Sequence, residues 1–101
     1  MATASYYVLT YELAGDYLER RPPLRAAHLG LARAAHERGE LVLAGALSEP
    51  ADRALLIFRV PDPAVVESFA REDPYVKNGL ITHWEVRPWT VVIGGQDALP
   101  G

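Results

Sequence analysis

The 101-residue chain contains no cysteine, which excludes disulfide bonds, thiolate catalysis and thiolate-bound zinc or iron–sulfur clusters. Its 10 Lys and Arg residues form no basic block and are outnumbered by 13 Asp and Glu residues. Clustered positive charge is what a nucleic-acid surface needs, so no nucleic-acid partner is expected. Apolar runs are far shorter than a membrane span, and the N-terminus lacks the pattern of a signal peptide. These absences predict a cytoplasmic protein without a membrane partner.

Motifs that bind phosphates or metals are also missing. There is no glycine-rich phosphate loop and no closely spaced run of His, Asp or Glu ligands, so we expect neither a nucleotide cofactor nor a metal. Ser48 and Ser68 lack the flanking glycines of a nucleophile elbow. The chemistry must therefore come from ordinary acid–base side chains.

Half of the residues are hydrophobic and the formal net charge is −3. A chain of this length fits one domain, which we place over residues 1–101, with an ordered core at about 5–94 and a loose tail at 95–101. A lone domain of this size is only marginally self-sufficient, and an oligomer would bury more surface.

Residue patterns predict strands, helices and loops in a definite order. Strands are expected at residues 6–11, 41–47, 54–60 and 80–86, with a loop at 15–21, a turn at 48–53 and a short extra strand at 89–93. Helices are expected at 24–38, entered through Pro22-Pro23, and from Pro63 to the Asp73-Pro74 interruption, with Asp62 as N-cap.

This βαββαβ order is that of the ferredoxin-like α+β fold, in which both helices cover one face of an antiparallel sheet. The two central strand segments, residues 41–47 and 54–60, are apolar on both faces and should form a hairpin. The sheet face without helices would then expose apolar side chains, which marks an interaction surface. A twofold partner is the commonest solution, so we expect a homodimer through the open sheet face, a dimeric α/β barrel.

His28 and Asp73 are the candidates for chemistry. His28 falls on the apolar stripe of the first helix together with Leu24, Leu31 and Ala35, and an imidazole there can act as a base. A core histidine bonded to a backbone carbonyl is the alternative. Asp73 can orient an imidazole and stabilise its charged form, or it can simply bond backbone amides beside Pro74.

Other polar residues have two interpretations each. Tyr75 either donates a hydrogen bond to a substrate oxygen or packs its ring, and Arg25 either binds an anionic substrate or is an exposed helix residue. Tyr17 and Arg21 are candidates for a lid. His36 is too distant along the helix to share a metal with His28, and His83 with Glu85 is best explained as a sheet-surface pair.

Several segments resemble the YCII-related (YciI-like) proteins, in register over residues 6 to 93. They are Tyr6-Tyr7-Val8, Arg21 with Arg25 to Leu29, Gly39 to Leu41 with Ala44 to Leu47, Asp73-Pro74-Tyr75 and Val86 to Trp89. The resemblance implies a dimeric α/β barrel whose pocket holds a histidine and an aspartate, by position His28 and Asp73. One relative is a dehydrochlorinase of a chlorinated hydroxyhydroquinone. The chain departs from the family at Gly45-Ala46-Leu47, where many members carry Gly-Pro-Leu.

Two functions follow as hypotheses. The first is a cofactor-independent lyase, dehydrochlorinase or isomerase that uses His28 and Asp73 on a small polar or phenolic substrate. Arg25, Tyr75 and Ser48, at the pocket rim, would bind that substrate. The second is a non-catalytic dimeric module that binds a small molecule. They differ in geometry, because only the first requires the imidazole and the carboxylate to meet beside a cavity.

Overall fold

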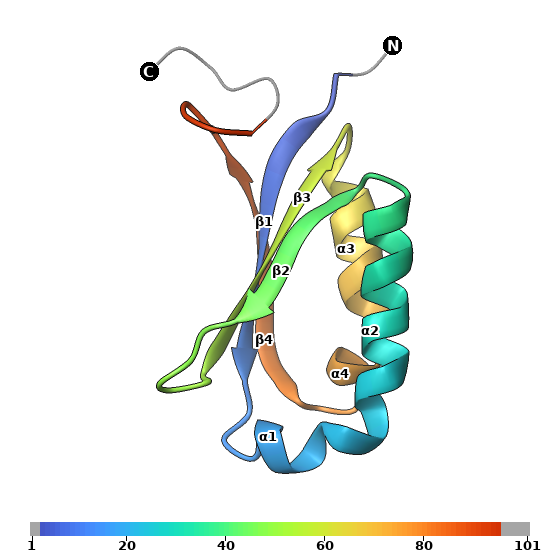
Figure 1. The fold of residues 1–101 in the computed structure, drawn as a ribbon, viewed down its shortest axis with the longest axis vertical. Helices are drawn as coiled ribbons and strands as arrows, with labels where there is room; N and C mark the ends of the chain where they lie inside the picture. The colour runs from blue at the N-terminus through green and yellow to red at the C-terminus, as the bar shows by residue number, and fades with distance from the viewer. Residues whose placement is uncertain (1–2, 96–101) are drawn as a thin grey trace.

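A four-stranded antiparallel sheet in the order β2-β3-β1-β4 carries the fold (Figure 1). The structure is a computed structural model that describes residues 3–95. The strands are β1 (Ser5–Leu13), β2 (Leu41–Ala46), β3 (Arg53–Val60) and β4 (Ile81–Trp89). β2 and β3 pair as the predicted hairpin.

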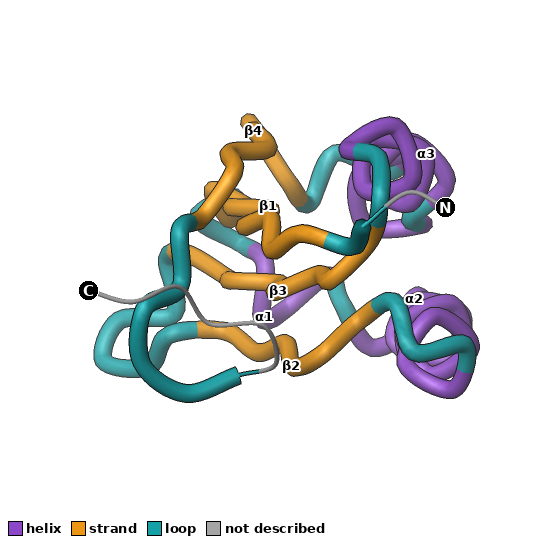
Figure 2. The backbone as a smooth tube through the Cα atoms, turned by 90° about the horizontal axis from the view of Figure 1, so that it is seen from above, coloured by secondary structure: helices purple, strands orange, loops and turns teal. Residues whose placement is uncertain are grey.

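Two long helices, α2 (Pro22–Glu37) and α3 (Pro63–Glu72), lie on the same face of the sheet in both views (Figures 1 and 2). Each begins at a proline, which loses no hydrogen bond in the first turn. The Asp62 side chain caps α3 by accepting from the backbone N–H of Ala64, as predicted. Two four-residue helices, α1 (Tyr17–Arg20) and α4 (Pro74–Lys77), complete the layer. The α+β ferredoxin-like prediction is confirmed.

The core lies between the sheet and these helices. Alternate residues of β1 and β3 face the helices, as the period of a strand requires, and the helices contribute their apolar stripes. The buried set includes Leu9, Tyr11, Leu13, Leu56, Phe58, Val60, Ala35, Val66, Phe69 and Ala70.

Two local expectations were wrong. The predicted loop at 15–21 contains α1, because the buried ring of Tyr17 anchors a helical turn against the core. The predicted interruption at Asp73-Pro74 is confirmed, since α3 ends at Glu72 and a new short helix, α4, starts at Pro74. No separate strand occurs at 89–93: β4 runs through Pro88 to Trp89. Because β4 pairs only with β1, it is an edge strand, where a missing N–H can face away from the ladder. The predicted tail lies mostly outside the described residues, at 96–101.

The other face of the sheet exposes apolar side chains. Leu43 and Leu55 come from the central hairpin and Trp89 from the end of β4, and they are 64%, 38% and 48% exposed. Strand register places Leu43 beside Ile57 and Tyr6 beside Trp89 on this face. None of the helices between residues 3 and 95 combines the length and the apolar character that a bilayer crossing requires.

Candidate active site

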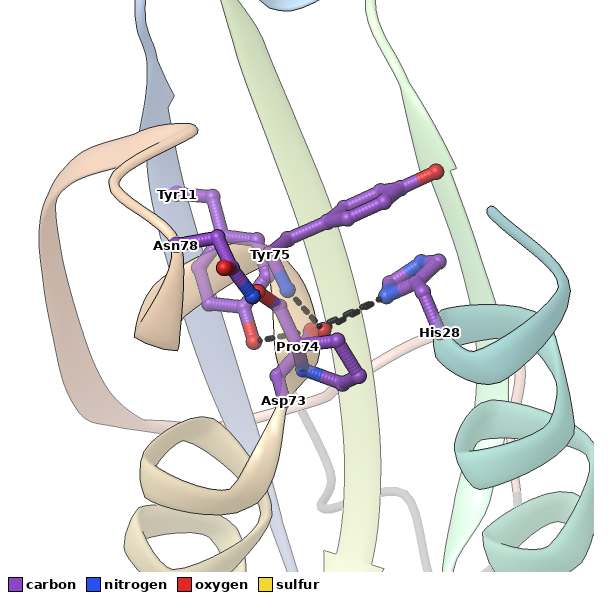
Figure 3. A network of polar contacts seen from close by, with 6 residues as sticks. All are labelled: Tyr11, His28, Asp73, Pro74, Tyr75 and Asn78. Atoms are coloured by element: carbon purple, nitrogen blue, oxygen red, sulfur yellow. Dashed lines mark hydrogen bonds and ion pairs between the residues drawn. The ribbon is translucent and has the colours of Figure 1, made fainter. Parts of the chain in front are cut away.

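The backbone brings His28 and Asp73 together although 45 residues separate them. His28 lies in the first half of α2, on the side that packs toward the sheet with Leu24 and Leu31. Asp73 is the single extended residue between α3 and α4, since the following proline disfavours a helical conformation there. This break turns the Asp73 side chain inward (Figure 3).

The Asp73 carboxylate is fully buried and is surrounded by donors. Its Oδ1 accepts from the backbone N–H of Tyr75 at 3.0 Å, and its Oδ2 accepts from the Tyr11 hydroxyl at 2.8 Å. His28 Nδ1 lies 2.9 Å from Oδ1 and 3.0 Å from Oδ2. Asp73 therefore caps α4 and contacts the imidazole at the same time, so the two sequence-based interpretations are both satisfied.

These contacts indicate which groups of the network donate hydrogen bonds and which accept them. Burial, followed by the charge of Asp73 and its hydrogen bond, raises the pKa of Tyr11 far above its usual value, so Tyr11 stays a donor. The backbone N–H is also a donor, which suits an ionised carboxylate. The hydrogen of the neutral imidazole must then sit on Nδ1, and Nε2 keeps its lone pair on the opposite side of the ring. Among the described residues, no side chain or backbone group bonds to Nε2.

The Tyr75 ring packs against the His28 ring. The two rings stack with centroids 3.9 Å apart and an interplanar angle of 9°, while Tyr17 meets Tyr75 edge-on at 5.6 Å. The Tyr75 hydroxyl is buried, and no described residue accepts a hydrogen bond from it. Burial, and next the neighbouring Tyr17, raise the pKa of Tyr75 against the opposing effect of Arg25 and Arg21. The hydroxyl therefore keeps its proton.

A cavity of about 260 Å³ opens beside this stack. The residues that line it come from the start of α2, from β2, and from β1 and β3. Figure 1 shows where these elements lie in the fold. On the β2 side the cavity is lined by Ala44, Gly45 and Ala46. These small residues leave the space next to α2 unfilled. The lining includes Tyr11, Tyr17, Arg21, Arg25, His28, Leu29, Ala44, Gly45, Ala46, Leu56 and Tyr75.

The sequence model of the YCII-related domain matches residues 4–90. The chain belongs to this family. Protein YciI of Escherichia coli is 28% identical over 95 residues, covering 85% of this chain and 97% of that protein. The structure of 5-chloro-2-hydroxyhydroquinone dehydrochlorinase from Burkholderia phenoliruptrix, in complex with 2,5-dihydroxybenzoquinone, is similar with a TM-score of 0.72 and 20% identity, covering 85% of this chain and 94% of that one. The structure of PA3566 from Pseudomonas aeruginosa has a TM-score of 0.57 and 12% identity, with 88% and 94% covered.

Four of the five predicted site residues of this YCII-related domain lie at or beside the cavity. His28, Arg25 and Tyr75 line the cavity, and Asp73 lies directly behind His28. Ser48 is exposed after the end of β2 and is not among the lining residues. β2 ends at Ala46, two residues before Ser48, and the role of Ser48 in binding a substrate stays a prediction.

Other polar residues lie elsewhere. His36 Nδ1 is 2.8 Å from the carbonyl oxygen of Leu41, outside the cavity. His83 and Glu85 are exposed on β4, with no contact between their side chains among the described interactions. Within residues 3–95, no three His, Asp or Glu side chains gather in a way that would hold a metal ion.

Two contributors of this YCII-related domain were missed or undervalued at the sequence level. Tyr11 donates to Asp73 across 62 residues, and Arg21 lines the cavity although it was considered only as part of a lid. A hint for Tyr11 did exist, because a tyrosine buried on a strand needs a partner for its hydroxyl. Which partner it finds depends on the packing of α3 and α4 against β1.

Proposed function

We propose that this YCII-related domain is a cofactor-independent enzyme that moves a proton on a small oxygenated ring, in an elimination or an isomerisation. The observation that carries the proposal is the contact between His28 Nδ1 and the buried Asp73 carboxylate, in a histidine that lines the cavity and whose Nε2 bonds to no described residue. A buried acid that holds an imidazole in one tautomer is the arrangement of a general base.

The proposed step begins when Nε2 accepts a proton from a substrate O–H or from a carbon next to a carbonyl. The electron pair of that bond becomes a new C=O or C=C bond. In an elimination the leaving group departs with its own electron pair, and in an isomerisation the imidazolium returns the proton to another atom. Asp73 stabilises the imidazolium that forms between these events. A base positioned in this way contributes about 10²–10⁴-fold to the rate.

The size of the cavity supports a substrate of one ring. A cavity of about 150 Å³ holds benzene, so about 260 Å³ accommodates one ring with a few substituents. The similar structure named as a 5-chloro-2-hydroxyhydroquinone dehydrochlorinase is complexed with a one-ring quinone. At 20% identity that likeness establishes the fold, and we take a halogenated hydroxyhydroquinone as the first substrate to try. In that reaction the ring carbon that bears chlorine would first receive a proton, which makes one C=O group, and chloride would then leave with its electron pair as His28 removes a second O–H proton and the second C=O group forms.

The test is turnover of chlorinated hydroxyhydroquinones. Two measurements monitor it: the release of chloride, and the exchange of ring protons with deuterated solvent. His28→Asn is the most informative variant, because its amide nitrogen can replace Nδ1 as donor to Asp73 while Nε2 is lost. His36→Gln is the matched control on the same helix, away from the cavity. We expect His28→Asn to lose turnover and exchange, and His36→Gln to retain both. Retained turnover in His28→Asn would contradict the proposal, and ligand binding without any proton exchange would favour the non-catalytic module.

We also propose that the domain acts as a homodimer through its open sheet face. The support is the exposure of Leu43, Leu55 and Trp89 on the face that no helix covers. Burying such side chains contributes about 25 cal/mol for each Å² of apolar surface removed from water. Sedimentation equilibrium should give twice the monomer mass, and a monomer at micromolar concentration would contradict it.

A further inference from the structure

The cavity contains two guanidinium groups that no acid neutralises. Arg21 and Arg25 lie one turn apart at the start of α2, and both line the cavity. Neither belongs to an ion pair of the described residues, which join Arg20 to Asp16, Arg38 to Glu40 and His28 to Asp73. Arg21 lies over the Tyr17 ring, 5.5 Å from its centre. The one acid at the cavity, Asp73, already accepts from three donors. The cavity is therefore electropositive.

A second, independent observation is the Tyr75 hydroxyl. A buried hydroxyl without a partner is costly, and its presence in a native structure requires an explanation. Tyr75 is 1% exposed, and no described residue accepts a hydrogen bond from its hydroxyl. Arg25, which lowers the pKa of Tyr75, has only donors and cannot supply that acceptor. Figure 3 shows the ring lying over His28 with the hydroxyl directed toward β2, whose residues also line the cavity. A ligand oxygen in the cavity would be the missing acceptor.

We propose that Arg21, Arg25 and the Tyr75 hydroxyl form an anion subsite for the charged oxygen of a one-ring carboxylate or phenolate. The subsite deepens the proposed function and rests on it for the identity of the reacting site. Because the Tyr75 ring stacks on His28, an oxygen held by the hydroxyl leaves the rest of the ligand beside Nε2. The same donor then faces the negative charge that develops on the oxygen when His28 removes a proton.

Binding can be measured by calorimetry with pairs of ligands that differ only in charge. Benzoate against benzamide tests the carboxylate, and 2,4-dinitrophenolate against 2,4-dinitroanisole tests the phenolate. One charge-assisted hydrogen bond corresponds to about tenfold or more in affinity. We expect at least one anion to bind about tenfold more tightly than its neutral counterpart, and the pair that shows this identifies the preferred oxygen. Equal affinities in both pairs, or no binding at millimolar concentration, would overturn the subsite.

Three variants assign the preference to residues. Arg21→Gln and Arg25→Gln should each reduce the affinity for the anion and leave that for the neutral partner unchanged. Arg33→Gln is the control, because Arg33 lies on the same helix, is exposed and does not line the cavity. An undiminished charge preference in both cavity variants would exclude these arginines.

Tyr75→Phe separates binding from packing. It removes a buried hydroxyl that has no acceptor in the protein and keeps the ring on His28, so the thermal midpoint should be equal to or above that of the wild type. Affinity for the anion should fall about tenfold. A lower midpoint with undiminished anion binding would show that the hydroxyl serves the fold and would overturn its role in the subsite.

The subsite and the proposed reaction fail separately. Charge-selective binding without turnover would retain the subsite and reject the enzyme. Turnover lost in His28→Asn, together with binding that ignores charge, would retain the enzyme and reject the subsite.

Discussion

Replacing Asp73 by asparagine tests the centre of the reasoning, because the side chain keeps its shape and loses its charge. Asp73 now accepts hydrogen bonds from Tyr11, from His28 and from the backbone of Tyr75. The remaining oxygen of the amide can still accept the backbone N–H and cap α4. Its NH₂ group would face Tyr11, whose hydroxyl can turn and accept, and His28 Nδ1. A donor opposite Nδ1 favours the other tautomer, with the hydrogen on Nε2.

The effects on stability and on catalysis should differ greatly in size. A hydrogen bond to a charged group is worth about 1.5–3 kcal/mol and a neutral one about 0.5–1.5 kcal/mol. Exchanging the first kind for the second at Tyr11 and at the Tyr75 backbone therefore costs about 2 kcal/mol, and the easier burial of a neutral amide offsets part of this. The fold should persist. Placing the hydrogen on Nε2 removes the base, and an Asp→Asn change in a comparable triad lowers turnover about 10⁴-fold.

Urea denaturation gives the free energy of unfolding, and the ¹⁵N shifts of the His28 ring report directly which nitrogen carries the hydrogen. Glu72→Gln is the matched control, since it neutralises the adjacent, exposed carboxylate. We expect a switch from Nδ1–H to Nε2–H and loss of proton transfer in Asp73→Asn alone. If that variant kept the Nδ1–H tautomer and full activity, Asp73 would only cap α4, and the proposed mechanism would be refuted.

Three further outcomes are expected. Folding raises the pKa of Tyr11 above its usual value of 10.0, first through burial and then through Asp73, so its contribution to stability is complete below pH 10 and declines above it by about 1.4 kcal/mol per pH unit. Tyr11→Phe should flatten that alkaline decline in urea denaturation, and an unchanged slope would show that Tyr11 is not its source. His28→Asn keeps a neutral hydrogen-bond donor at Asp73 but loses the ring that stacks on Tyr75, so the free energy of unfolding should fall by about 0.5–1.5 kcal/mol; a loss of several kcal/mol would reveal a structural histidine. Leu43→Asp, at a side chain 64% exposed, should halve the mass in sedimentation without lowering the monomer's stability, whereas an intact dimer would place the interface elsewhere.

Much of the fold follows from local pattern. The prolines at residues 22 and 63 mark where α2 and α3 begin, and runs of apolar, aromatic and β-branched residues identify the strands. These signals act between near neighbours and can be seen without coordinates. The exceptions, α1 and the long β4, are short or irregular elements. There, the burial of one ring or the position at a sheet edge outweighs propensity.

The candidate site was also predictable from the sequence only in part. The sequence by itself determined the element order and, through the likeness of its segments to a family, the importance of His28 and Asp73. Three facts became visible only in the tertiary structure. Tyr11 donates a hydrogen bond to the Asp73 carboxylate, and Ser48 is not among the residues that line the cavity. Arg21 lines the same cavity as Tyr75, whose hydroxyl has no acceptor among the described residues. The physical reason is distance along the chain. Each of these relations depends on strand order, register and helix packing, which are set by the whole core rather than by any segment of it.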